Sequence, residues 1–153
     1  MRKIGITSKI IYMKNLVFIV FFFISCGTIG HVQFYNFNAS KYEVEKELLN
    51  IINKDSLHSV PVKWADINKD PGPIELIYLY FSQSPEEMYQ VGFTGTITQW
   101  KNSSYCKLSL DGVFNGDHWG FKKELSYNEM KRIRERFEKE ILSKIKYGYC
   151  KSS

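Results

Sequence analysis

The sequence predicts an α+β fold: an antiparallel meander of three to four strands, with an N-terminal and a longer C-terminal helix packed on one face. Apolar residues recur at helical spacing near both ends of the globular part, and between those ends they alternate with polar residues at a period of two. Segments in the order helix, strands, helix favour hairpins covered by helices on one side. The 153 residues, 44% apolar and 24% charged, suit one compact domain and exclude a disordered tail, a collagen-like fibre or a multi-pass membrane protein.

The first helix is expected over residues 41–53. Ser40 precedes Glu43 by three residues, which is the spacing of a capping box at a helix start. Residues 55–73 contain three prolines and several polar residues, so they predict a loop with little regular structure. We expect Trp64 to anchor this loop to the core.

The strands follow that loop. Residues 74–81 are almost continuously apolar and predict a strand covered on both faces, although the pattern alone leaves a short buried helix open. Residues 88–100 alternate between apolar and polar types and form the clearest strand, with Gly92 and Gly95 marking a bulge or a bend. The remaining predicted elements of the sheet are a hairpin turn at 101–104, a returning strand at 106–111 and a fourth short strand near 119–123.

The last helix is expected to begin after Ser126, which forms a second capping box with Glu129. Its apolar stripe runs from Met130 to Ile145, and Gly148 stands where a helix C-cap belongs. Basic and acidic residues interleave on this helix at spacings of three and four. That pattern favours a solvated face with salt bridges over a membrane-facing or anion-binding surface.

The amino-terminal segment predicts a secretory signal peptide. A basic stretch precedes nine apolar residues at 16–24, which are too few for the roughly 20 that span a bilayer. An uncleaved membrane anchor and a shorter start at Met13 remain alternatives. Four of the 21 basic residues and none of the acidic ones lie in residues 1–25, so most of the net charge of +5 belongs to the leader. A nucleic-acid partner is therefore not expected.

The end of the leader resembles the lipobox of bacterial lipoproteins. The matching residues are Phe23-Ile24-Ser25-Cys26, with Phe23 where leucine is usual. In that family the cysteine is acylated on sulfur and becomes the new amino terminus after cleavage. The resemblance therefore implies lipidation of Cys26 and a bilayer as a partner, because acyl chains of this kind give stable attachment.

The same resemblance implies a division of the chain and a location. Residues 1–25 are the signal peptide, residues 26–39 the lipidated cysteine and tether, and residues 40–153 a single α+β domain. Part of the tether, residues 31–37, is aromatic enough to be a docked segment or a first strand. No acidic residue follows Cys26 closely, so the resemblance implies the periplasmic face of an outer membrane within the cell envelope.

The two other cysteines predict a disulfide. With Cys26 assigned to lipid, Cys106 and Cys150 are an even pair in an oxidising compartment. A bridge would close a loop of 44 residues and pin the carboxyl-terminal end to the sheet. Two buried free thiols are the alternative. Neither cysteine lies in a Cys-x-x-Cys pair, which leaves a redox or zinc role without support.

An aromatic-rich set of residues on the predicted strands is the candidate binding surface. An open sheet face carrying such side chains suits a protein or cell-wall partner, whereas packed helices would turn the same residues into core. The candidate binding residues are Tyr78, Tyr80, Tyr89, Trp100 and Tyr105.

The best catalytic pattern is Asp117 beside His118 in a loop flanked by glycine. A carboxylate next to an imidazole can perform acid–base chemistry, although Asn-Gly-Asp is also ordinary hairpin sequence. The three histidines are far apart in sequence and lack metal-ligand spacing, so neither a metal site nor a cofactor is expected. The sequence therefore favours a non-enzymatic binding module, possible partners being an envelope protein, a cell-wall component or an inhibited effector. The alternatives are a small envelope hydrolase that uses Asp117 and His118, and a purely structural envelope component.

Overall fold

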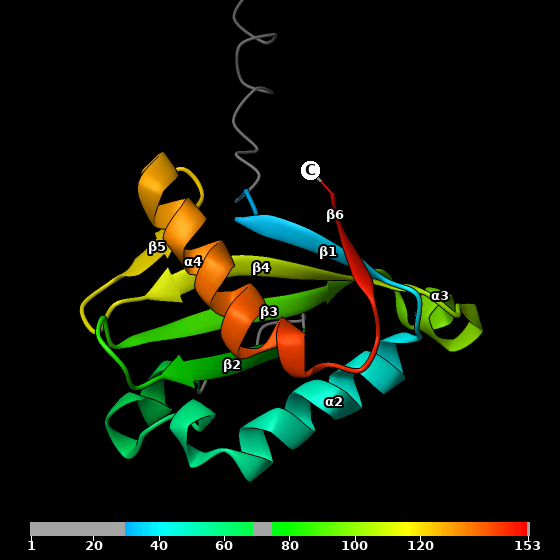
Figure 1. Ribbon diagram of the computed structural model, residues 1–153, viewed down its shortest axis with the longest axis horizontal. Coiled ribbons are helices and arrows are strands. Elements are labelled where there is room, and N and C mark those ends of the chain that lie inside the picture. Colours follow the sequence, from blue (N-terminus) through cyan, green and yellow to red (C-terminus); the bar gives the residue numbers. More distant parts are fainter. Residues whose placement is uncertain (1–29, 69–74, 153) are drawn as a thin grey trace, which may run out of the picture.

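The computed structural model describes residues 30–68 and 75–152 and has an α+β architecture (Figure 1). Six strands in these residues form one antiparallel sheet in the order β2-β3-β4-β1-β6, with β5 paired to β4. The strands are β1 (Gln33–Phe37), β2 (Leu76–Phe81), β3 (Glu87–Thr94), β4 (Cys106–Phe114), β5 (Trp119–Phe121) and β6 (Tyr149–Ser152).

Two helices of equal length, 14 residues each, cover one face of this sheet. They are α2 (Lys41–Lys54) and α4 (Tyr127–Glu140), and both lie on the same side of the strands (Figure 1). The predicted α+β class, the antiparallel sheet and the C-terminal helix are thus confirmed, but the C-terminal helix is not the longer one. The shorter helical segments are α3 (Ile97–Asn102), η2 (Ser56–His58), η3 (Val62–Asn68) and η4 (Leu142–Lys144).

Both long helices begin at the predicted capping boxes. The Ser40 hydroxyl accepts a hydrogen bond from the backbone N–H of Glu43, whose carboxylate accepts one from the Ser40 backbone N–H at 2.9 Å. Ser126 and Glu129 repeat this exchange at the start of α4. Each box satisfies two N–H groups that the first helical turn leaves without partners.

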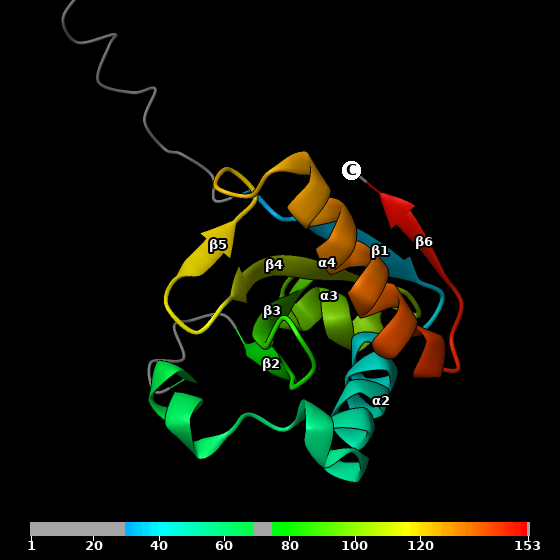
Figure 2. The same cartoon turned by 60° about the vertical axis from the view of Figure 1, so that its left-hand side comes forward.

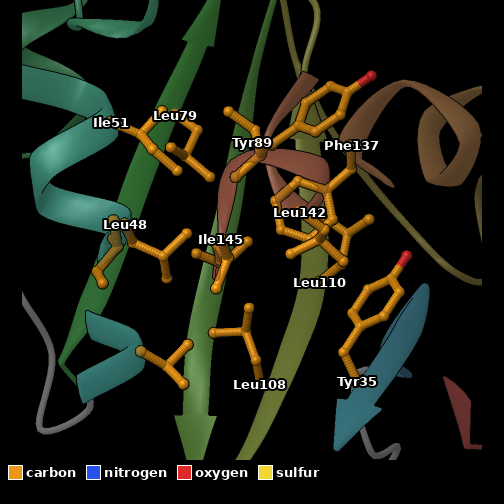
Figure 3. Packing of buried hydrophobic residues seen from close by; sticks show 14 of the residues in the cluster. Tyr35, Leu48, Ile51, Leu79, Tyr89, Leu108, Leu110, Phe137, Leu142 and Ile145 are labelled. Atoms are coloured by element: carbon orange, nitrogen blue, oxygen red, sulfur yellow. The ribbon is translucent and has the colours of Figure 1, made fainter. Parts of the chain in front are cut away.

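The main core lies between these helices and the sheet (Figure 3). Leu48 and Ile51 of α2 and Phe137 of α4 point toward the strands, where they meet Leu79 and Leu108. All five side chains are buried. At about 25 cal/mol per Å² of apolar surface removed from water, such packing is the main force that holds the layers together.

Residues 33–37, for which the sequence left a tether, a docked segment and a first strand open, form a strand inside the sheet. β1 pairs with β4 through Gln33 opposite Leu110, and on its other edge it pairs with β6. Tyr35 is fully buried, which explains the aromatic composition of this segment. Residues 33–37 therefore belong to the sheet and not to a tether, and the sheet has strands that the predicted meander lacked.

The strand predicted over residues 88–100 is wrong in its second half. β3 ends at Thr94, Gly95 makes a turn with φ +138°, and α3 follows. Thr96 and Gln99 form a third capping box that starts this helix. The bulge predicted near the glycines lies in the partner strand instead, because Gly112 pairs with Gln90 while Leu110 pairs with Val91.

The end of α4 also differs from the prediction. The helix stops at Glu140, with Ile141 as its C-cap. The apolar stripe continues through Leu142 and Ile145 because η4 keeps these side chains in the core. Gly148 is therefore not a helix cap but lies in the connection to β6.

A second, smaller core lies on the other face of the sheet. Trp64 of η3 packs edge-on against Tyr80 and Phe114, with ring centroids 5.3 and 5.2 Å apart. The predicted role of Trp64 as the anchor of its loop is thus confirmed. Figure 2 shows the η2–η3 segment leaving the end of α2 and passing beneath β2. Residues 55–68 have more regular structure than predicted, and residues 69–74 lie outside the described part.

Candidate functional site

The predicted aromatic patch does not form one surface. Tyr89 is fully buried on the face that the helices cover. Tyr78 and Tyr80 lie on the opposite face, where Tyr78 contacts Trp119 at 6.0 Å between ring centroids and Tyr80 contacts Trp64. These three tyrosines therefore serve two separate cores. Only Trp100 and Tyr105 remain in a shared exposed region.

That region is one end of the molecule, and we call it the α3 end. Trp100 is half-buried on α3, and Ile97 on the same helix is 64% exposed. Tyr105, three residues beyond α3, is 70% exposed, and Tyr42 from the first turn of α2 is 47% exposed. Figure 1 shows α3 beside the start of α2, away from β5. The α3 end consists of Tyr42, Ile97, Trp100 and Tyr105.

A tight turn positions Trp100 at this end. The indole Nε1 donates to the backbone carbonyl of Thr94 at 3.3 Å and lies directly over Gly95. A Cβ at Gly95 would lie 2.7 Å from that nitrogen, so only glycine allows both the positive φ and the close approach of the ring. The capping box of Thr96 then fixes the first turn of α3.

Lys41 joins α3 to α2. Its Nζ lies 2.7 and 2.8 Å from the two carboxylate oxygens of Glu45 and 2.9 Å from Oε2 of Glu75. Burial by itself lowers the pKa of Lys41, but the hydrogen bonds to the two carboxylates outweigh it and raise the pKa above its usual value. The rings around this ammonium are those of Tyr42, Phe93 and Trp100, with centroids at 5.3, 5.5 and 5.2 Å.

This cation–π cluster is occupied by the protein's own ammonium, so it fixes the α3 end rather than leaving a cage for a ligand cation. Cation–π contacts of this kind contribute about 0.5–2 kcal/mol, depending on desolvation. Lys41 is 3% exposed, which favours the upper part of that range. Ile97 and Tyr105 therefore project from an end of the domain that the contacts of Lys41 hold in place. The chemistry they offer is apolar contact, with the Tyr42 and Tyr105 hydroxyls as hydrogen-bonding groups.

Asp117 and His118 are adjacent but occupy an exposed turn. The side chain of Asp117 is 94% exposed and that of His118 68% exposed, with 3.4 Å between Oδ2 and Nδ1. The Asn115 side-chain oxygen accepts hydrogen bonds from both backbone N–H groups, which is the geometry of an Asx turn. Neither residue lines the clefts found in the described part of the chain. The structure thus gives these two residues a turn-forming role.

A cleft of about 330 Å³ that the sequence did not predict is lined by His58, Asp55 and Lys144. His58 Nδ1 donates to the Tyr80 carbonyl at 2.9 Å, because a carbonyl can only accept. Its Nε2 therefore accepts from the Lys144 ammonium, 3.3 Å away. Asp55 lies 3.4 Å from the same ammonium. Both ring nitrogens of His58 are thus engaged in contacts that join η2 to β2 and η4.

The predicted disulfide between Cys106 and Cys150 is absent, and both thiols are free. The sheet explains why. Phe37 of β1 pairs with Cys106 on one side and with Tyr149 on the other, so β1 separates the two cysteines. Cys150 follows Tyr149 and points to the opposite face of the sheet. Cys106 is buried in the main core, and desolvation raises the pKa of its thiol to about 12. Cys26 lies outside the described residues.

Two structural features are absent from residues 30–68 and 75–152. No group of three or more metal-binding side chains comes together there. No helix in the same residues is long and apolar enough to cross a membrane.

Comparison with protein-family models, with curated proteins and with solved structures finds no match to this chain.

Two residues of the α3 end, Tyr42 and Ile97, were not among the sequence candidates. The Thr96-x-x-Gln99 capping box is a local signal that would have identified α3 and hence the exposure of Ile97. No local sequence signal indicates that Tyr42 lies near Trp100. The two rings meet at the ammonium of Lys41, which precedes Trp100 by 59 residues.

Proposed function

We propose that this protein is a membrane-anchored lipoprotein of the cell envelope whose domain acts as a non-enzymatic binding module, with the α3 end docking a protein partner. The observation that carries the proposal is the α3 end itself. Ile97 and Tyr105 are large, mostly exposed side chains at the same end of a domain whose other predicted aromatic residues are core.

Exposed aromatic and aliphatic side chains are suited to apolar contact with a partner protein. Single exposed apolar residues are common on protein surfaces, but grouped ones next to a half-buried tryptophan resemble the anchors of protein interfaces. Gly95 and Lys41 hold Trp100 in place. A partner that docks here would therefore pay only a small conformational-entropy cost for ordering this surface. A partner with a complementary apolar patch fits this surface better than a charged one.

The anchoring half of the proposal rests on the resemblance of Phe23-Ile24-Ser25-Cys26 to a lipobox. Labelling of cells with a fatty-acid probe should mark the wild-type protein and not the Cys26→Ala variant. Equal label on the two proteins would refute acylation at this cysteine.

The binding half is tested by substitution at matched positions. Tyr105 and Tyr127 are 70% and 71% exposed, so Tyr105→Ser and Tyr127→Ser remove similar surface from different ends of the domain. Similarly, Ile97→Glu is matched by Val62→Glu on η3. In affinity purification from solubilised envelope, the α3-end variants should lose a partner that the wild type and both controls retain. Equal recovery by all five proteins would refute the α3 end as the docking surface.

The same purified proteins separate binding from the alternative of a small hydrolase. His118→Ala should leave partner capture unchanged, because His118 lies in an exposed turn far in sequence from α3. A hydrolase that uses Asp117 and His118 would instead lose turnover of cell-wall fragments in this variant while keeping its fold. Recovery of cell-wall fragments instead of a protein would assign the α3 end to a different class of ligand.

A further inference from the structure

The described chain starts beside a set of exposed basic and aromatic side chains, which we call the anchor end. A Cβ at Gly30 would lie 3.1 Å from Cδ of Lys122, so the chain enters the domain in contact with this lysine. Lys123 follows in the same turn, and Tyr127 begins α4 with 71% of its surface exposed. The anchor end consists of Gly30, Lys122, Lys123 and Tyr127.

The distance from the anchor end to the predicted lipid is short. Gly30 follows Cys26 by four residue steps, and a fully extended chain of that length spans at most about 14 Å. That reach is small compared with the domain, because nine residues of β4 alone extend about 27 Å. An acylated Cys26 would therefore hold the anchor end within one short tether of the headgroups.

The strands then carry the chain away from this point. Gln33 at the start of β1 pairs with Leu110, and Phe37 at its end pairs with Cys106, which follows α3 along the chain. Figure 1 and Figure 2 both show the start of β1 near β5 and the first turn of α4. The α3 end thus lies at the other end of β1 from Gly30.

The charge of the anchor end suits an anionic surface. Within the described residues, neither Lys122 nor Lys123 forms an ion pair, and both are exposed. Glu124, the nearest acidic residue in sequence, uses its carboxylate to accept a hydrogen bond from the Phe121 backbone N–H at 2.8 Å. Each basic residue close to an anionic bilayer strengthens binding about fivefold. An exposed tyrosine such as Tyr127 suits the interfacial region, where aromatic side chains are enriched.

We infer that the domain rests with its anchor end on anionic lipid headgroups, with Lys122, Lys123 and Tyr127 in contact with them, and that the α3 end faces away from the bilayer. This inference rests on the proposed acylation of Cys26. It adds the orientation of the domain, which the lipid alone does not specify, and it leaves the α3 end accessible to a partner.

The test uses the full-length acylated protein in vesicles of phosphatidylethanolamine and phosphatidylglycerol that contain a lipid with a headgroup nitroxide. A fluorophore is placed at Tyr127→Cys or at Ile97→Cys in a Cys150→Ser background, where the remaining Cys106 is buried. We expect the nitroxide to quench the label at position 127 several-fold more than the label at position 97. Equal quenching, or stronger quenching at position 97, would overturn the orientation.

Charge-reversal variants test the role of the two lysines. Lys122→Glu combined with Lys123→Glu should reduce the quenching at position 127. The matched double variant Lys46→Glu and Lys101→Glu changes exposed lysines elsewhere and should leave it unchanged. An equal effect of both double variants would overturn the headgroup contact.

Flotation of the same vesicles separates this inference from the proposed function. Protein that floats with the vesicles but shows equal quenching at both positions retains the anchor and refutes only the orientation. Protein that fails to float refutes acylation at Cys26, and the orientation with it.

Discussion

Arg132 holds the carboxylate of Glu87 with both terminal nitrogens of its guanidinium. Nη1 lies 2.8 Å from Oε2 and Nη2 lies 2.5 Å from Oε1. Glu87 is the first residue of β3 and is 3% exposed, so this two-point contact ties α4 to the sheet. Arg136 of the same helix adds a third contact at 3.2 Å. Hydrogen bonds in which both partners are charged are the strongest in proteins.

Removal of the charge of Glu87 should therefore destabilise the fold. In Glu87→Gln an amide replaces one acceptor oxygen, which leaves the Arg132 guanidinium without its counter-charge and Arg136 with Glu140 alone. Because Arg132 is partly exposed, we expect the free energy of unfolding to fall by about 2–4 kcal/mol, toward the lower end of the cost of breaking a buried pair. Urea denaturation followed by circular dichroism measures this change.

The control is Glu135→Gln on the same helix, where the carboxylate lies 3.8 Å from the Lys131 ammonium and both side chains are exposed. A pair of this kind contributes about 0–1 kcal/mol. Similar losses in the two variants would contradict the special role of Glu87.

The two described cysteines should differ in reactivity. Cys150 is exposed, whereas Cys106 is buried and its thiol has a pKa of about 12. The thiolate is the reactive form, so native protein at pH 8 should be alkylated at Cys150 and not at Cys106. Mass spectrometry after denaturation in a second alkylating reagent distinguishes the positions. Protection of both cysteines that reducing agent relieves would reveal a disulfide and contradict the structure.

The capping boxes should make stability depend on pH. Hydrogen bonds from the Ser40 hydroxyl and backbone lower the pKa of Glu43 below its usual value of 4.5, and Ser126 does the same for Glu129. A carboxyl group with a lower pKa in the folded state contributes stability above its unfolded pKa and loses it as the pH falls through the folded pKa. We therefore expect unfolding to become easier on acidification from about pH 5 to pH 3.

Variants at the Ser40–Glu43 capping box test whether the capping boxes cause this dependence on pH. Glu43→Gln keeps an acceptor at the same position but cannot titrate there, and Ser40→Ala removes a donor that lowers the pKa of Glu43. Both variants should show a smaller dependence of unfolding free energy on pH than the wild type in this range. An unchanged slope in both would mean that the caps do not cause the acid sensitivity.

The turn at Gly95 should tolerate no side chain. Gly95→Ala forces a positive φ on alanine and places Cβ 2.7 Å from Nε1 of Trp100, so we expect a loss of about 1–3 kcal/mol in unfolding free energy. The same variant should weaken partner capture, because Trp100 must move. Gly148→Ala is the control, since no atom lies within 4 Å of its added Cβ. Equal stability of the two variants, measured by thermal unfolding, would contradict this account.

The sequence predicted the elements that carry their own local signals. Ser40 with Glu43 and Ser126 with Glu129 specify both helix starts, because a capping box is complete within four residues. The apolar run that became β2 and the alternating pattern whose first half became β3 likewise predicted strands. These signals suffice for the class of fold and for the shared face of the two helices.

Elements whose partners are distant could not be predicted in this way. β1 and β6 are five and four residues long, and the register that makes them strands comes from Leu110 and from each other. α3 was missed for another reason: its residues continue the alternating pattern of β3, and the positive φ at Gly95 ends that strand just before the Thr96 capping box starts the helix. Sequence periodicity carries no information on such a turn.

Strand register also explains why the predicted aromatic residues do not form one surface. Tyr89 pairs with Leu79 in the β2–β3 hairpin, and paired residues point to the same face. Tyr78 and Tyr80, on either side of Leu79, therefore point to the other face. A change of register by one residue would have put all three tyrosines together, and the spacing within each strand does not decide between these registers.

The position of β1 has a consequence for the order in which the protein is made. β1 is synthesised first of the six strands, yet its two neighbours in the sheet, β4 and β6, come from the second half of the chain. β4 can pair with β3 and β1 once residue 114 has been released from the ribosome, but the β1–β6 pair cannot form until Ser152 has followed. A polypeptide that stalls before Tyr149 would present one edge of β1 without its neighbour, and exposed edges of this kind are templates for aggregation.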